Sequence, residues 1–219
     1  MITYKNYYGL NYIEFVQLSE FNNLKFLISI RNEMPLFAAK NMVTKLMCDN
    51  VTDLITVNQV HGDGSIVVDD DFIDSYGKGD FKLFPDADAI ITSLKYVPIA
   101  IYTADCLPIL LFDGSRSVMA LVHAGKKGTE KNIAQRSVDT MKKKYKTRNR
   151  DITAIIGPSI GPCCYDKDLW SENEKQLKKK GVKTIINSRT CTACNNEKYF
   201  SYRKEKGTKG RMITSAMLV

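Results

Sequence analysis

The chain has 219 residues, of which 44% are hydrophobic and 26% are charged, and its formal net charge is +8 at pH 7. A chain of this length buries roughly 70% of its unfolded surface, which excludes the small scaffolds that need disulfides or a structural metal in order to fold. The N-terminus lacks the features of a signal peptide and no uncharged run approaches the roughly 18 residues of a membrane helix, so we expect a cytoplasmic protein.

Short runs of β-branched residues alternate with turn residues and a few helical patterns, which is typical of a mixed α/β domain. The predicted strands, in chain order, are residues 12–17, 24–30, 54–60, 65–68, 89–92, 98–103, 109–112, 118–122, 152–156, 182–186 and 212–217. The sequence contains no internal repeat, low-complexity tract or linker. We therefore expect one domain over residues 1–219.

Three segments have helical spacing. One helix is predicted over residues 35–47, with proline at an early helical position, and another over residues 168–180, ended by Gly181. The third runs from near Thr129 to Tyr145, since apolar residues recur there at helical intervals and lysines close the last turn.

The basic excess is concentrated in residues 114–219, with runs at 142–150 and 178–180. Such runs can contact the phosphates of nucleic acid. They are also typical of solvated helix ends, because cations are favourable at a helix C-terminus. No aromatic-rich RNA module, zinc finger or helix-turn-helix pattern accompanies them, so we favour helix ends and do not expect nucleic acid or a membrane as a partner.

The chain has only two histidines, and both follow an apolar run and precede small residues, in QVHG at 59–62 and LVHAG at 121–125. Cys106 follows another apolar run between them. Zinc prefers imidazole nitrogen and thiolate sulfur, and a catalytic zinc has three protein ligands and one open position. His61, Cys106 and His123 are therefore a candidate ligand set, while packed histidines and a buried thiol remain the alternative.

The other cysteines give weaker signals. Without an export signal they are expected to be thiols or metal ligands rather than disulfides. Cys191 and Cys194 form a CxxC, but no second CxxC completes a four-cysteine zinc site. Cys163 and Cys164 follow a predicted strand in a turn suited to line a pocket; inert buried thiols are the favoured interpretation, and we predict no disulfide between them.

Five segments follow one another in a distinctive order: QVHG at 59–62, DADAIIT at 86–92, ADCLPI at 104–109, HAG at 123–125 and IGPSIGPCCY at 156–165. Together they resemble the YfiH-like family, also called the laccase-domain or polyphenol oxidase family and associated with purine nucleoside phosphorylase activity. The segments CT at 191–192, YFSYR at 199–203 and GRM at 210–212 extend the resemblance from about residue 54 to the end.

The resemblance implies a single mixed α/β sandwich with flanking helices and a catalytic zinc bound by His61, Cys106 and His123. It also implies phosphorolysis of adenosine, inosine and methylthioadenosine to the free base and the sugar 1-phosphate, with some adenosine deamination. Purine nucleoside and phosphate are then the partners. Two histidines cannot build a multicopper cluster, so copper is an alternative loading of the site and phenol oxidation a side activity.

Two departures from the family pattern concern the pocket. HAG is usually followed by an aromatic residue and arginine, whereas this chain has Lys126 and Lys127, which lack planar stacking and bidentate anion geometry. A glycine-rich segment that follows Ser-Thr-Arg in the family is shortened after Arg31. We therefore expect part of the pocket wall to differ.

Phosphorolysis requires an anion held on one face of the anomeric carbon. Candidates are Lys127, assigned a catalytic role, together with Lys126, Arg31 and the backbone amides at the helix start near Thr129. For the lysines, solvated loop charges are the alternative.

The other assigned residues belong to the resembling segments. Gln59 and Cys163 are assigned to substrate binding. Asp105, beside the thiol ligand, is a candidate general acid/base or orienting residue, and a turn residue that caps the strand end is its alternative.

Two other functions are open. Without metal, Cys106 and His123 could act as a nucleophile and base in an amidase for a cell-wall precursor or another amide, with Asp105 or Asp88 orienting the imidazole. In a basic binding protein stabilised by zinc, a closed site would need a fourth ligand, for which Cys163 or Cys164 is the candidate.

Overall fold

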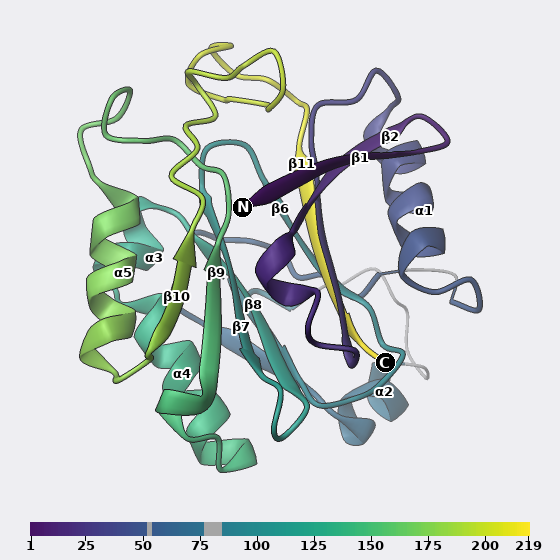
Figure 1. The fold of residues 1–219 in the computed structure, drawn as a ribbon, viewed down its shortest axis with the longest axis vertical. Coiled ribbons are helices and arrows are strands. Elements are labelled where there is room, and N and C mark those ends of the chain that lie inside the picture. Colours follow the sequence, from purple (N-terminus) through teal and green to yellow (C-terminus); the bar gives the residue numbers. More distant parts are fainter. Residues whose placement is uncertain (52–53, 77–84) are drawn as a thin grey trace.

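The computed structural model, in which residues 1–51, 54–76 and 85–219 are described, contains two β-sheets packed face to face (Figure 1). The five-stranded sheet has the order β1 (Ile2–Tyr7), β2 (Leu10–Phe15), β3 (Leu24–Ser29), β11 (Met212–Leu218) and β6 (Ile99–Thr103). The six-stranded sheet has the order β10 (Thr184–Asn187), β9 (Ile152–Ile156), β7 (Leu107–Asp113), β8 (Val118–Ala124), β5 (Ala89–Thr92) and β4 (Ser65–Val68).

Helices cover the outer faces of both sheets. Figure 1 shows α1 (Leu36–Met47) on one side, and α3 (Lys126–Glu130), α4 (Ile133–Tyr145) and α5 (Leu169–Lys179) on the other. The other described helices are α2 (Asp70–Tyr76) and two 3-10 turns, Val16–Leu18 and Asn149–Asp151. No described helix is long and apolar enough to cross a membrane.

The central strands are buried on both faces, which explains their continuous apolar sequences. In β7, Leu110 and Phe112 pack into the core between the sheets, whereas Ile109 and Leu111 pack toward α4 and α5. The predicted mixed α/β sandwich with flanking helices is confirmed.

Two local predictions differ from the structure. Residues 54–60 form only isolated bridges, because Ile55 pairs with Ile99 of one sheet and Asn58 with Asp86 beside the other, so that the segment crosses between sheets. The helix predicted from Thr129 begins three residues earlier and is interrupted at Asn132, whose φ of 62° is left-handed. Asparagine adopts this conformation more readily than most residues.

Two elements were not predicted, for the same physical reason. β1 is an edge strand whose four central residues are exposed, and α2 is short and acidic, so neither has the apolar periodicity of a buried element. The basic residues Lys142, Lys143 and Lys144 lie in the last turn of α4, as the helix-end interpretation predicts.

Candidate metal centre and substrate pocket

The structure brings His61, Cys106 and His123 together. Their nitrogen and sulfur ligand atoms all lie within 4.8 Å of one another, and the two imidazole rings meet edge to face with centroids 4.9 Å apart. Two nitrogens and one thiolate sulfur match the donors that zinc prefers, and three protein ligands leave a position for substrate or water.

Sheet register places these side chains. Leu107 pairs with Ala124, so Cys106 comes just before β7, beside the end of β8 where His123 lies. On the other side of β8, Ala89 pairs with Val122, and the amide of His123 donates to the carbonyl of Asp88 at 2.7 Å. The starts of β5 and β7 and the end of β8 therefore meet at one edge of the sheet.

Asp88 connects both histidines. Its Oδ1 lies 2.7 Å from Nδ1 of His123 and accepts a hydrogen bond from the amide of His61, while Oδ2 accepts from the amide of Gly62 at 2.6 Å. Burial opposes its ionisation, but the hydrogen bonds from His123 and Gly62 hold the pKa of Asp88 below its ordinary value. Because a carboxylate only accepts, Nδ1 of His123 carries the proton and Nε2 is the nitrogen available to a metal.

Hydrogen bonds in the centre favour the thiolate form of Cys106, whereas His123 must release a proton when a metal binds. Burial raises the pKa of Cys106, but hydrogen bonds from His123 and His61 outweigh it and lower that pKa to about 6. Burial lowers the pKa of His123, but Asp88 and Cys106 raise it to about 9. Without metal the pair is a thiolate and an imidazolium near neutral pH, and the thiolate is the form that a metal requires.

The backbone around the centre is tightly constrained. His61 and Asp105 have positive φ values of 60° and 89°, and such strain is often concentrated at functional sites. A Cβ atom on Gly125 would lie 3.1 Å from Sγ of Cys106 and 3.1 Å from Cδ2 of His61. Glycine is therefore needed here because the ligands approach the backbone closely.

A pocket of about 820 Å³ opens beside the three ligands. The rest of its lining includes a group of basic and aromatic residues, here called the basic wall: Lys126, Tyr165, Tyr202, Arg203, Lys206 and Arg211. Two cations lie near the ring of Tyr165, with Nζ of Lys126 at 5.9 Å and Cζ of Arg203 at 5.2 Å from the ring centroid. Such a wall can hold an anion and stack against a planar base.

Lys126, Gln59 and Asp105 line this pocket, and all three already have partners; Nζ of Lys126 donates to Oδ2 of Asp166 at 3.3 Å. Gln59 donates from Nε2 to the carbonyl of Tyr102 and accepts from the amide of Tyr102 at Oε1. Asp105 accepts from Oγ1 of Thr192 at 2.6 Å and from the amide of Arg203 at 2.8 Å. These contacts favour positioning roles for Gln59 and Asp105. Asp105 connects the loop after β10 to the segment that carries Cys106.

Three other predicted site residues, Lys127, Arg31 and Cys163, are not among the pocket-lining residues. Lys127 is exposed in α3, and Cys163 contacts other cysteines. The amide of Thr129 was also a predicted phosphate donor, but it donates within α3 to the carbonyl of Gly125, because the helix begins before it.

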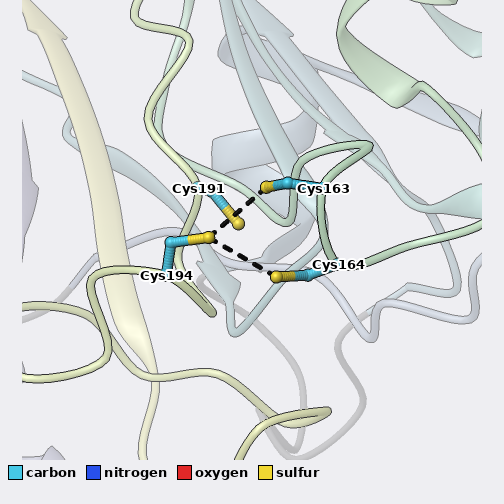
Figure 2. A group of neighbouring side chains, drawn as sticks. All are labelled: Cys163, Cys164, Cys191 and Cys194. Carbon is cyan, nitrogen blue, oxygen red and sulfur yellow. Dashed lines mark hydrogen bonds between the residues drawn. The ribbon is translucent and has the colours of Figure 1, made fainter.

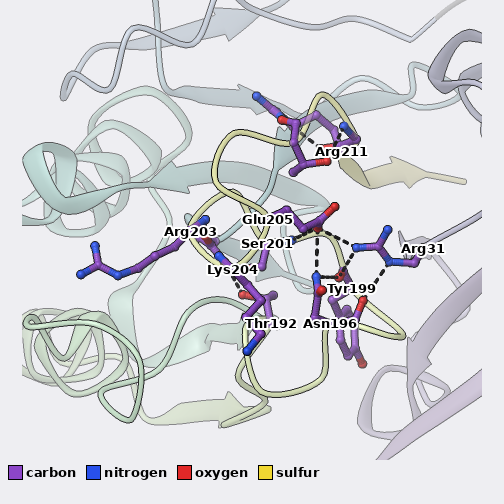
Figure 3. A network of polar contacts seen from close by, with 12 residues as sticks. Arg31, Thr192, Asn196, Tyr199, Ser201, Arg203, Lys204, Glu205 and Arg211 are labelled. Carbon is purple, nitrogen blue, oxygen red and sulfur yellow. Dashed lines mark hydrogen bonds and ion pairs between the residues drawn. The ribbon is translucent and has the colours of Figure 1, made fainter.

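Arg31 holds a loop rather than a ligand (Figure 3). Its guanidinium stacks on Phe200 at 4.4 Å, donates from Nε to the carbonyl of Asn196 and pairs with Oε1 of Glu205 at 2.6 Å. The same Glu205 oxygen accepts from the amide of Ser201 and from Nδ2 of Asn196. This network fixes the segment that carries Tyr202 and Arg203 to the pocket.

We expect Glu205→Gln to lower the free energy of unfolding by about 1.5–3 kcal/mol near pH 7, because hydrogen bonds to a charged group contribute about that much. Burial opposes ionisation, but hydrogen bonds from Ser201, Asn196 and Arg31 lower the pKa of Glu205 to about 2. Its stabilisation is therefore complete above the unfolded pKa of about 4.3 and is lost as the pH falls toward the folded value.

Urea unfolding at several pH values measures this effect: the two proteins should differ most near neutral pH and converge in acid. Glu197→Gln, at an exposed position of the same loop, is the control. A difference between wild type and Glu205→Gln that does not change with pH would contradict the role of the charge.

Neither the basic wall nor Asp88 was fully assigned from sequence. Arg203 and Arg211 lie in segments that carry the family resemblance, but whether their side chains face the pocket depends on the conformation of a long loop. Asp88 was considered only as an orienting residue for an amidase. Its position two residues after Asp86, directly before a strand, is the signal that could have linked it to His123.

The chain is similar in sequence to known proteins. A family model described as multi-copper polyphenol oxidoreductase laccase matches residues 37–167 and 165–219. A purine nucleoside phosphorylase from Clostridium acetobutylicum is 33% identical over an alignment of 191 residues, with 75% of this chain and 77% of the relative covered.

Two further similarities concern activity and fold. An adenosine deaminase from an unknown prokaryotic organism is 28% identical over 197 residues, with 75% of each chain covered. The crystal structure of the hypothetical protein YfiH from Bacillus licheniformis superposes with a TM-score of 0.86 at 22% identity, covering 99% of both chains. This last similarity concerns the fold alone.

Proposed function

The chain belongs to the multi-copper polyphenol oxidoreductase laccase family, and on that premise we propose that it is a zinc-dependent purine nucleoside phosphorylase. The observation that carries the proposal is the pocket, whose lining combines two imidazoles and a thiolate with the basic wall. Adenosine, inosine and methylthioadenosine are the proposed nucleosides.

His61, Cys106 and His123 would hold the zinc, with Asp88 fixing the orientation of both imidazoles. When bound, zinc supplies a Lewis acid that can polarise a substrate oxygen or nitrogen. All three residues line the pocket, so the centre faces it.

The phosphate is proposed to bind at the basic wall. Arg203 and Arg211 carry planar guanidinium groups that can bind phosphate oxygens in pairs, and Lys126 and Lys206 add positive charge. Arginines from the C-terminal loop thus supply the bidentate geometry that Lys126 and Lys127 lack. The ring of Tyr165 is available to stack on the purine.

In phosphorolysis a phosphate oxygen forms a bond to the anomeric carbon while the bond from that carbon to the purine nitrogen breaks. Positive charge develops on the sugar and negative charge on the base. The basic wall would hold the phosphate against one face of the sugar. Its positive charges would reduce the repulsion between the phosphate and the negative charge that develops on the base. The pocket would also exclude water, which otherwise competes with phosphate.

We expect the purified protein to release adenine from adenosine only when phosphate is present, with the sugar 1-phosphate as the second product. Chromatography of base, nucleoside and sugar phosphate, over a panel of the three nucleosides, measures this. Equal rates of base release with and without phosphate would identify a hydrolase instead.

Deamination of adenosine is a second candidate, favoured by the open three-ligand centre and by the relative named adenosine deaminase. A metal-bound water with its pKa lowered to ~7 is the usual nucleophile of that reaction. The same assay distinguishes it, because inosine would form from adenosine without phosphate.

A further inference from the structure

Four cysteines outside the pocket form a second cluster (Figure 2). Cys163 and Cys164 lie in the turn that follows β9, and Cys191 and Cys194 lie in the turn that follows β10. All four Sγ atoms lie within 4.8 Å of one another, and all four thiols are free. The turn after β9 thus supplies, as adjacent cysteines, the second pair that the CxxC was predicted to lack.

The sulfur separations match ligands of one metal ion rather than disulfides. Sγ of Cys194 lies 3.4 Å from Sγ of Cys163 and 3.5 Å from Sγ of Cys164. Four sulfurs around a tetrahedral zinc, each at about 2.3 Å from the metal, lie about 3.8 Å from one another. A disulfide requires about 2.05 Å, so the observed spacing is far too long for that bond.

The surroundings of the sulfurs suit a metal site. The amide of Gly161 donates a hydrogen bond to Sγ of Cys191 at 3.3 Å, a contact that stabilises a thiolate ligand. Cys191 is buried, whereas Cys163 and Cys194 are exposed and give an ion access from solvent. Thiolates without nitrogen or oxygen donors select zinc or iron in tetrahedral geometry.

The cluster joins two loops that form one wall of the pocket. Ser159 and Cys191 form a β-bridge, next to which the amide of Thr192 donates to the carbonyl of Ser159 at 3.0 Å. Thr192 in turn binds Asp105, and Tyr165 directly follows Cys164 and lines the pocket. The cysteines thus lie within a few residues of groups that shape the site.

The loop after β10 has little regular secondary structure to hold it in place. Residues 188–211 contain turns and one bridge but no helix or strand, and they carry Tyr202, Arg203, Lys206 and Arg211 to the pocket. A metal that closes a long irregular loop reduces the conformational entropy of its open states.

We propose that Cys163, Cys164, Cys191 and Cys194 bind a second zinc ion in a closed tetrathiolate site, which holds the pocket wall in place. Its four protein ligands leave no position for substrate. Its role is therefore structural, unlike that of the centre formed by His61, Cys106 and His123.

Metal analysis of variants separates the two sites. Protein purified with zinc in the growth medium and without chelators should contain two zinc ions per chain. Cys191→Ser with Cys194→Ser should retain one, and His61→Ala with Cys106→Ala should also retain one. Cys48→Ser, a cysteine of neither cluster, should keep both. The proposal is overturned if wild type contains only one zinc ion and the variant with Cys191→Ser and Cys194→Ser retains it. Iron in place of zinc at the four cysteines would also overturn it.

X-ray absorption keeps the proposal testable if the serine variants fold poorly. In His61→Ala with Cys106→Ala the four cysteines are intact, and the remaining zinc should have four sulfur neighbours at about 2.3 Å. Nitrogen or oxygen neighbours, or no zinc at all, would overturn the proposal.

Limited proteolysis tests the structural role. Cys194→Ser should be cleaved within residues 188–211 several-fold faster than wild type, and Cys48→Ser should not. Equal cleavage rates in Cys194→Ser and wild type, despite zinc loss, would show that the ion does not hold the loop.

Discussion

Cys106→Ala is expected to lower kcat/KM for phosphorolysis by about 10³-fold or more, because a metal ion stabilises transition-state charge by several kcal/mol and each 1.36 kcal/mol is worth a factor of ten. Cys106 supplies the thiolate of the centre, and its removal leaves only two imidazoles to hold the metal. Steady-state kinetics and zinc content should therefore fall together, while circular dichroism shows that the fold is retained.

Cys48→Ser is the matched control, since this cysteine packs beside α1, is not among the pocket-lining residues, and should retain wild-type rates. Unchanged base release by Cys106→Ala would contradict the metal-centred proposal. Activity toward amides in metal-free wild type, lost when Cys106 is alkylated, would instead support the nucleophilic thiol of an amidase.

The candidate ligands could be predicted from sequence because their positions follow from local pattern. His61, Cys106 and His123 each follow an apolar run; sheet register brings Cys106 and His123 together, and Asp88 at the start of β5 binds the amide of His61. The same apolar runs predict the central strands of both sheets. Scarcity of histidine then reduces the number of ways in which the site can be assembled.

The pocket wall could not be predicted in this way, because its residues come from a loop without periodicity. Arg203 reaches the pocket through the hydrogen bond of its amide to Asp105, a contact between residues 98 positions apart. Arg31 looked available for an anion, but Glu205, 174 positions later, pairs with it. Long-range pairings of this kind leave no trace in spacing.

The cysteine cluster shows a third limit. The expectation of a CxxC partner excluded Cys163 and Cys164, because adjacent cysteines do not fit the usual spacing of a zinc knuckle. A turn presents both of these side chains toward Cys194. Ligand geometry depends on side-chain direction, and sequence spacing approximates it only where the backbone conformation is standard.

Asp88→Asn is expected to weaken zinc binding by about 10–100-fold, the usual cost of losing a group that orients metal-binding histidines. The amide side chain of the variant has one acceptor oxygen where the carboxylate has two, yet Asp88 faces Nδ1 of His123 and the amides of His61 and Gly62. The new NH₂ group would therefore face a donor, and an unsatisfied buried donor costs about 1–3 kcal/mol.

The distinguishing measurement is the zinc dependence of activity. Asp88→Asn should need more zinc for half-maximal rate but approach wild-type kcat at saturating zinc, since Asp88 acts through His61 and His123 and not on the substrate. Asp86→Asn is the matched control, because Asp86 is exposed and accepts from Asn58. Wild-type zinc affinity combined with a low kcat that excess zinc does not restore would make Asp88 a proton-transfer residue, and the orientation of the two imidazoles would then require another explanation.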